Sequence, residues 1–117
     1  MNRASNTPAT RRRRKKTLKQ AKGFFGSKHK LFKTAKEQVM NALDDAYQGR
    51  KQRKRDMRRL WITRLNNACQ KEGLKYSRFI RLLTLAQIKL NRKELSEMAI
   101  HQPQHFQALI KKAQNPW

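Results

Sequence analysis

The sequence predicts an all-α protein in which a long basic N-terminal helical arm precedes a small helical C-terminal domain. No segment alternates apolar and polar residues as a strand would, whereas apolar residues recur at helical spacing. The chain has 30 basic residues (Lys and Arg) and 7 acidic residues (Asp and Glu). Residues 1–59 contain 20 of the basic and 4 of the acidic residues (net +16), and residues 60–117 contain the other 10 basic and 3 acidic residues (net +7). A chain of 117 residues has room for one small core. We therefore expect residues 1–59 to form an extended RNA-binding arm and residues 60–117 an all-α globular domain that includes the end of the long helix.

The arm begins with residues 1–10, which are polar, contain Pro8 and predict no regular structure in isolation. Residues 11–22 are good helix formers, although their six adjacent positive charges oppose a helix until phosphates neutralise them. A break follows near residues 23–26, where two glycines enclose two aromatics, and Ser27 is positioned to cap the next helix.

A long helix is predicted from residue 27 to residue 71, because this segment has no proline and carries an apolar stripe at helical spacing. The stripe is interrupted at residues 50–56, which include no apolar residue. A continuous helix of 45 residues would be about 67 Å long, against a diameter of roughly 35 Å for a compact chain of this size. Such a helix needs another molecule to lie against.

Short helices are predicted in the C-terminal domain. Gly73 should end the long helix, Ser77 should cap the next one, and Pro103 suits the first turn of the last. Asn91 and Glu94 have the spacing of a capping box. The predicted core combines the end of the long helix with these helices: Leu60, Trp61, Leu65, Phe79, Ile80, Leu82, Leu83, Leu85, Leu95, Met98, Ala99, Phe106, Leu109 and Ile110.

The formal charge of +23 favours a polyanionic partner, and nucleic acid is the densest one available. No stretch approaches 18 uncharged apolar residues, so we expect no membrane span. The single cysteine, Cys69, excludes an internal disulfide framework and a zinc finger, and its phase with Leu65 predicts a buried small side chain.

Catalysis and metal binding have little support in the sequence. The acids are scattered, and no phosphate loop or nucleophile motif is present. His101 and His105 have ligand spacing on a helix, but Pro103 lies between them and no third ligand is near in sequence. We therefore expect no enzyme activity, no metal and no cofactor.

Basic residues on the arm, with a few aromatic and hydroxyl groups, are the expected RNA-binding residues. Phe24 and Phe25 either stack on unpaired bases or pack on the helix, and Tyr76, Ser77 and Arg78 form either a phosphate site or a plain helix start. The full set is Arg11, Arg12, Arg13, Arg14, Lys15, Lys16, Lys19, Lys22, Phe24, Phe25, Lys28, Lys30, Lys33, Arg50, Lys51, Arg53, Lys54, Arg55, Arg58, Arg59, Arg64, Tyr76, Ser77 and Arg78.

Several stretches carry a family resemblance. Residues 11–16 and 21–26 form one, Leu-Phe-Lys-Thr-Ala at 31–35 the next, Lys-Arg-Asp-Met-Arg-Arg-Leu-Trp-Ile-Thr-Arg-Leu-Asn at 54–66 the third, and Gly-Leu-Lys-Tyr-Ser-Arg-Phe-Ile at 73–80 the last. Together they resemble the bacterial large-subunit ribosomal protein L20 family (bL20) over nearly the whole chain. The resemblance implies a structural protein whose arm threads into large-subunit rRNA, beside neighbouring large-subunit proteins, early in subunit assembly. It also implies binding of its own mRNA as a translational repressor.

The chain departs from the family pattern at three places: residues 4–7 are neutral, Gly49 stands where Asp is usual, and Gln102 precedes Pro103 where Asp or Asn is usual. A bend at Gly49 and fraying of the last helix are the expected effects. The resemblance implies a cytoplasmic location in the ribosome, with an organellar ribosome as the alternative. Two other classes stay open: a DNA-binding regulator built on the short C-terminal helices, and a membrane-surface helix.

Overall fold

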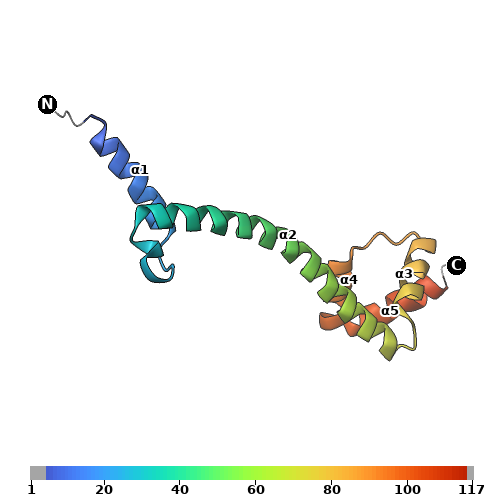
Figure 1. The fold of residues 1–117 in the computed structure, drawn as a ribbon. Helices are drawn as coiled ribbons and strands as arrows, with labels where there is room; N and C mark the ends of the chain where they lie inside the picture. Colours follow the sequence, from blue (N-terminus) through green and yellow to red (C-terminus); the bar gives the residue numbers. More distant parts are fainter. Residues whose placement is uncertain (1–4, 116–117) are drawn as a thin grey trace. The chain divides into compact units, whose positions relative to one another are not determined.

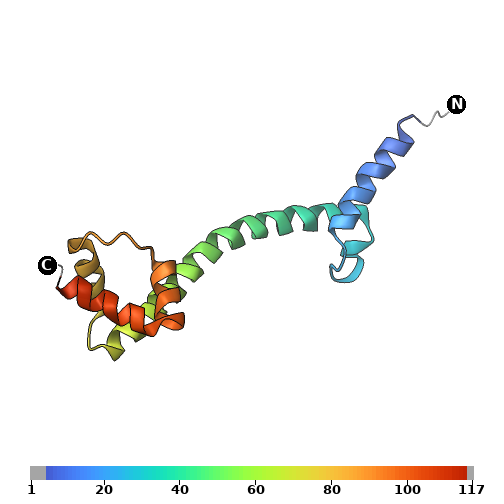
Figure 2. The same ribbon diagram turned by 180° about the vertical axis from the view of Figure 1, so that it is seen from behind.

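The computed structural model describes residues 5–115 and contains only helical elements in that range. In chain order these are α1 (Thr7–Gln20), the 3₁₀ helix η1 (Gly26–His29), α2 (Phe32–Lys71), α3 (Tyr76–Leu85), α4 (Arg92–His101) and α5 (Pro103–Gln114), as Figures 1 and 2 show from opposite sides. The predicted all-α class is confirmed. The chain divides into two compact units, unit 1 (Met1–Lys51) and unit 2 (Gln52–Trp117), which are described separately below.

Helix α1 begins at Thr7, so the expectation of irregular structure up to residue 10 is wrong for residues 7–10. Pro8 lies in the first turn, where its missing N–H costs no intrahelical hydrogen bond and its fixed φ suits the helix. Residues 1–4, for which irregular structure was also expected, lie outside the residues that the structure describes. The run of arginines and lysines is helical up to Gln20, although its adjacent charges were expected to oppose a helix in the absence of phosphates.

Ser27 does not cap the long helix, as its sequence position suggested. It lies inside η1, and its carbonyl oxygen accepts hydrogen bonds from the backbone N–H groups of Lys30 and Leu31, both at 3.0 Å. The chain therefore makes one tight 3₁₀ turn before α2 starts at Phe32.

Helix α2 is the predicted long helix, shorter at its start and continuous for 40 residues through Gly49. Its end follows the prediction, because Gly73 adopts φ 72°, which a glycine tolerates without strain. The N–H of Gly73 donates to the carbonyl of Gln70 (3.0 Å) and the N–H of Leu74 to that of Cys69 (2.9 Å), the two bonds of a Schellman motif. This turn brings Leu74 into the core of unit 2.

The short helices of unit 2 begin and end by different devices. Lys75, not Ser77, is the N-cap of α3, so Ser77 lies within the first turn and the predicted cap is wrong. The capping box of α4 is confirmed: Asn91 Oδ1 accepts from the Glu94 N–H (2.8 Å), and the Asn91 N–H donates to Glu94 Oε2 (3.2 Å). Helix α5 starts with Pro103 as predicted.

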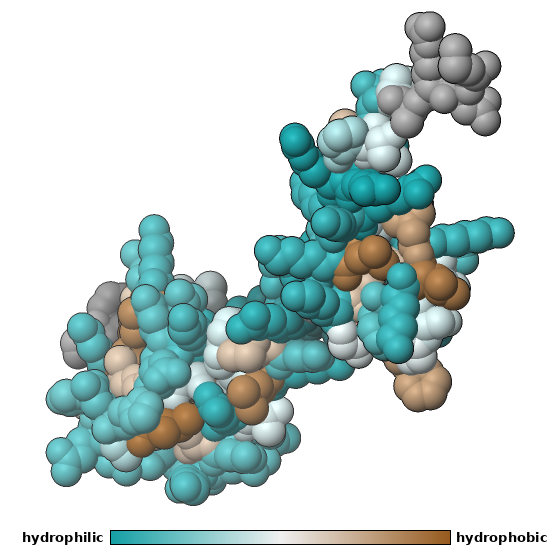
Figure 3. All heavy atoms as spheres, turned by 90° about the vertical axis from the view of Figure 1, so that its left-hand side faces the viewer, coloured by the Kyte–Doolittle hydropathy of each residue, from teal (hydrophilic) through white to brown (hydrophobic). Residues whose placement is uncertain are grey.

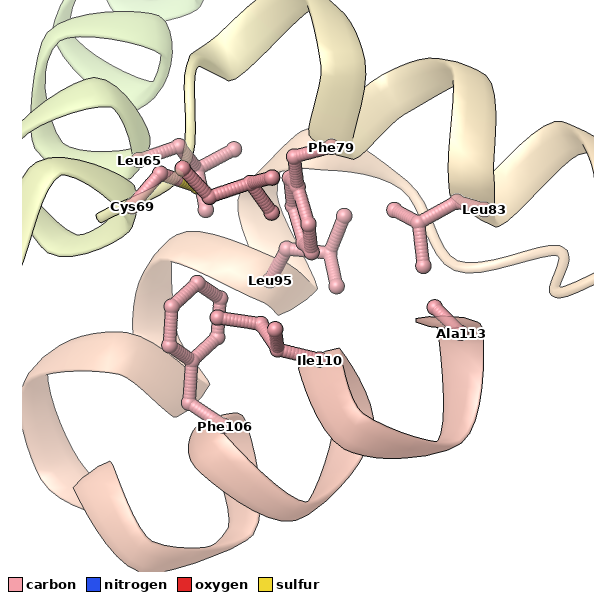
Figure 4. Close-up of a cluster of buried hydrophobic side chains, with 9 residues drawn as sticks. Leu65, Cys69, Phe79, Leu83, Leu95, Phe106, Ile110 and Ala113 are labelled. Carbon is pink, nitrogen blue, oxygen red and sulfur yellow. The ribbon is translucent and has the colours of Figure 1, made fainter. Parts of the chain in front are cut away.

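The core of unit 2 gathers side chains from α2, α3, α4 and α5, which point into a common interior in Figure 4. The rings of Phe79 and Phe106 lie 5.5 Å apart between centroids. Nine residues are buried there: Leu65, Cys69, Leu74, Phe79, Leu83, Leu95, Phe106, Ile110 and Ala113.

Leu60 and Trp61 were expected in this core and lie outside the cluster, so that part of the core prediction is wrong. Leu60 is 39% exposed and Trp61 is only partly buried. The buried cluster takes residues of α2 only from Leu65 onward, so one turn earlier the same helix faces solvent. Leu85, which is 67% exposed at the end of α3, is also outside the core.

Helix α3 ends in a second Schellman motif whose left-handed residue is not glycine. Gln87 has φ 57°, its N–H donates to the Thr84 carbonyl (3.1 Å), and the Ile88 N–H donates to the Leu83 carbonyl (3.0 Å). A residue with a side chain is strained in this conformation.

Replacing Gln87 with glycine should therefore raise the free energy of unfolding of unit 2 by about 0.5–1 kcal/mol, because glycine adopts this φ without strain. Urea unfolding of the full chain measures the change. The matched control is Gln70→Gly, another exposed glutamine but in helical conformation, which should lower stability by about 1 kcal/mol. Equal effects of the two substitutions would contradict the assignment of strain to Gln87.

The Cys69 thiol is buried in the core, as predicted, and burial raises its pKa from the ordinary 9.0 to about 11. In the unfolded chain the thiol ionises first, so above pH 9 the unfolded state binds fewer protons and is favoured.

The free energy of unfolding should thus decline between pH 9 and pH 11 more steeply in the wild type than in Cys69→Ala, by up to about 2–3 kcal/mol in total. Urea unfolding across this pH range measures both slopes. Identical slopes would show that the thiol does not contribute to the alkaline loss of stability.

Candidate nucleic-acid interface

The first group of expected RNA-binding residues lies on α1, which presents positive charge on all its sides. Residues 11–16 are consecutive and all exposed, and consecutive helical residues point 100° apart. No carboxylate occurs in the sequence before Glu37. The guanidinium of Arg14 lies over the ring of Phe32, 5.4 Å from its centroid, which ties α1 to the start of α2. Unit 1 thus carries a helix whose charge has no counterion of its own.

The segment between α1 and α2 separates the two aromatics of the predicted pair. Phe24 packs against the small cluster of Ala21, Ala35 and Val39, whereas Phe25 is 89% exposed. Of the two predicted roles, packing on the helix is therefore confirmed for Phe24. Phe25 does not pack within unit 1. The predicted lysines of this region are distributed over the turn, η1, the residue that ends η1 and the first turn of α2: Lys22, Lys28, Lys30 and Lys33.

The second basic group lies on a stretch of α2 that remains exposed among the residues that the structure describes. Every residue from 43 to 60 is exposed, so no side chain in this part of the helix is fully buried. Lys51, Lys54, Arg55 and Arg58 are spaced three, four and seven residues apart and share one face. Figure 3 shows the predominance of hydrophilic side chains on the face it presents. Residues 50–56 of this stretch include no apolar residue, so this part of the helix is polar on all sides, as is typical of a solvated or partner-bound element.

Intramolecular neutralisation of this stretch is minimal. Asp56 lies 3.8 Å from Arg59 and accepts a hydrogen bond from Gln52 Nε2 at 2.9 Å, and all three side chains are exposed. This is the only Lys or Arg ion pair within residues 5–115. The ammonium of Lys51 lies 4.5 Å from the ring centroid of Tyr47. Exposed ion pairs contribute at most about 1 kcal/mol, so most of these cations remain available to an external anion.

The predicted site residues of unit 2 do not form one cluster. Tyr76 packs on the core, and its hydroxyl accepts a hydrogen bond from Arg92 Nε (2.9 Å), so it supports the fold. Ser77 and Arg78 line a shallow hollow on α3 with Arg81, which the sequence reasoning missed although its spacing from Ser77 and Arg78 places it on their face. Arg64 lines a different hollow, together with Asn67 and Lys71 of α2 and residues of α4 and α5.

The two histidines considered as metal ligands make local contacts instead. His101 Nε2 lies 3.2 Å from Glu97 Oε2, and His105 Nδ1 donates to Gln102 Oε1 at 2.9 Å. Within residues 5–115 no three His, Cys, Asp or Glu side chains come together as a metal site. In the same residues, no helix is both long and apolar enough to cross a membrane.

Arginine and lysine arranged in this way bind phosphates. Guanidinium groups bind phosphate oxygens in pairs, and lysine acts as a mobile point charge. Two exposed basic helical stretches, one in α1 and one in α2, provide many such contacts. The arrangement is therefore typical of binding to a polymer of phosphates.

The amino-acid sequence is similar to those of ribosomal proteins. Residues 3–109 match the model of a family described as "Ribosomal protein L20". The chain is 54% identical over 115 residues to the "Large ribosomal subunit protein bL20" of Acholeplasma laidlawii, covering 98% of this chain and 91% of the relative. It is 59% identical over 101 residues to the protein of the same name from a Thermoanaerobacter strain (86% and 85%), and 51% identical over 113 residues to that of Lactococcus lactis (97% and 95%).

Proposed function

Since the chain belongs to the ribosomal protein L20 family of structural large-subunit proteins, we propose that it binds large-subunit rRNA directly and supports early assembly of the subunit. The observation that carries this proposal is the exposed stretch of α2, residues 43–60. Of its seven Lys and Arg residues, only Arg59 forms an ion pair with a carboxylate within the described residues. The family is not one of enzymes, and the role proposed for these cations is to neutralise phosphates so that RNA helices can pack closely.

The proposed division of labour follows the charge. Residues 1–59 act as the RNA-binding arm, and residues 60–117 provide the folded domain that anchors it. Both lie in a cytoplasmic ribosome in this proposal, among neighbouring proteins of the large subunit. The predicted binding of the protein's own mRNA stays a prediction, and we assign it to the hollow of unit 2 that Ser77, Arg78 and Arg81 line.

The DNA-binding alternative is disfavoured by the start of α4, which would be the recognition helix of a helix-turn-helix. Recognition helices present free side chains there to base edges. In this chain Asn91 and Glu94 are engaged in the capping box, and Arg92 donates to the Tyr76 hydroxyl. Three of the four polar residues at positions 91–94 therefore serve the fold, and only Lys93 is left to face a partner.

The function is tested by comparing the affinity of the full chain for large-subunit rRNA, small-subunit rRNA and duplex DNA at one salt concentration, using rRNA from Lactococcus lactis as the probe. We expect binding to large-subunit rRNA to be tighter by more than about tenfold, because specific contacts add to the nonspecific phosphate attraction. Equal affinity for all three would show that the protein binds nucleic acids nonspecifically through its positive charge, and would overturn the proposal. Preference for DNA would support the regulator instead.

A second experiment tests the basic stretch of α2. Replacing Arg53, Lys54, Arg55, Arg58 and Arg59 with Gln should weaken binding to the same rRNA and flatten the slope of log affinity against log salt. Each lost phosphate contact contributes about 0.7–0.9 to that slope, so five lost contacts flatten it by about 3.5–4.5.

The matched control for this variant replaces five exposed lysines of unit 2 with Gln: Lys71, Lys89, Lys93, Lys111 and Lys112. It removes the same net charge, and we expect a much smaller change in slope. If the two variants change the slope equally, the α2 stretch binds no more phosphate than any other basic surface of the protein.

A further inference from the structure

Phe25 is the most exposed of the large hydrophobic side chains described, with 89% of its surface accessible. It follows Phe24, which packs on the buried Ala21, Ala35 and Val39. Two adjacent aromatics thus have opposite environments: one is fixed to unit 1, and the other points away from it. Exposure of a whole phenyl ring leaves the free energy that its burial would contribute unused.

The backbone that presents Phe25 is held in place by several contacts. The Phe24 N–H donates to the Ala21 carbonyl (3.1 Å), and the Lys28 N–H donates to the Phe25 carbonyl (3.3 Å). His29 Nδ1 lies 2.8 Å from the Phe24 carbonyl oxygen, which can only accept, so Nδ1 carries the proton. The flanking Gly23 and Gly26 adopt φ 85° and 64°. Phe25 is therefore presented on a turn that its neighbours define.

The charge around this turn indicates what covers the ring. Lys22, Lys28 and Lys30 lie within five residues of Phe25, and the described chain has no carboxylate before Glu37. The centre of a protein interface is depleted of charge, so covering this ring with apolar protein would desolvate these lysines without a partner. Single-stranded nucleic acid suits both features, because its phosphates meet the lysines and its bases present faces for stacking.

We propose that Phe25 stacks on an unpaired nucleobase of the large-subunit rRNA, with the partly buried Phe24 as the anchor that fixes the turn and with the three lysines on the adjoining phosphates. This inference rests on the proposed function and adds a contact with a base to the phosphate contacts of the helices. It gives the arm a point at which an unpaired position in the RNA is distinguished from a continuous duplex.

The experiment compares the full chain with Phe25→Ala, Phe25→Leu and Phe25→Tyr, using Lactococcus lactis large-subunit rRNA as the probe. Affinity is measured over a range of salt concentrations, and base-by-base reactivity toward dimethyl sulfate and carbodiimide locates protected bases. Phe25→Ala should weaken binding about 5- to 150-fold, since stacking on one base contributes about 1–3 kcal/mol. Phe25→Leu should behave like Phe25→Ala, and Phe25→Tyr like the wild type, because the contact needs an aromatic face. The protein loses no charge in these variants, so the salt slope should not change.

Lys22→Gln is the matched control at the same turn. It should flatten the salt slope by about 0.7, as loss of one single-strand phosphate contact does, without making a protected base reactive. In Phe25→Ala and Phe25→Leu the opposite pattern is expected: an unchanged slope, and one protected base, or a few neighbouring ones, that becomes reactive. Because Phe25 buries almost nothing in unit 1, the circular dichroism of these variants should equal that of the wild type.

Wild-type affinity in Phe25→Ala would overturn the inference. So would wild-type affinity in Phe25→Leu with unchanged base reactivity, which would indicate an apolar contact such as one with a neighbouring protein. Either result leaves the proposed function standing, provided that the wild type prefers large-subunit rRNA. If the wild type has no such preference, the proposed function fails and this inference fails with it.

Discussion

Electrostatic self-repulsion is the constraint on which the rest of this structure depends. With 30 basic and 7 acidic residues, the chain cannot balance its charge internally, and of the Lys and Arg residues within 5–115 only Arg59 lies within ion-pair distance of a carboxylate, that of Asp56. Repulsion of this size opposes compaction. The architecture meets it by placing charge on helices exposed on all sides and by restricting the larger core to nine buried residues where α2 ends. The cluster of unit 1 has only three, two of them alanines.

Helix α2 serves two different environments along one face. Arg58 lies seven residues before Leu65, and Lys54 eleven before it, so these residues share a side of the helix with the core residue. At Leu65 and Cys69 that side is buried among α3, α4 and α5. Two to three turns earlier it carries ammonium and guanidinium groups in solvent. The helix therefore needs no change of direction to pass from a protein core to a phosphate-binding surface, and the register between the two is fixed by the helix itself.

Elements with local chemical signals were predicted correctly. Gly73 ends α2, Asn91 and Glu94 form the capping box, and Pro103 starts α5, because each device works through groups within a few residues. Ser27 and Ser77 failed as caps because a serine hydroxyl is only one of several ways to begin a helix: a 3₁₀ turn occupies Ser27, and α3 starts before Ser77. Trp61 was misplaced for a different reason. Periodicity tells which side of a helix is apolar, but not how far along the helix its partners extend. The site prediction found the basic groups by composition and missed Arg81, whose relevance depends on the hollow it shares.

The exposed stretch of α2 also bears on the lifetime of the protein. A helical segment with no fully buried side chain opens locally at low free-energy cost, and an opened segment is the form that a protease cuts. This one holds seven Lys and Arg residues, each a potential cleavage point for proteases that recognise basic side chains. RNA lying against the same residues would cover those points and hold the helix closed. Copies made in excess of their binding sites would thus be degraded faster than incorporated ones, so the surface that neutralises phosphates would also adjust the amount of protein to the amount of RNA.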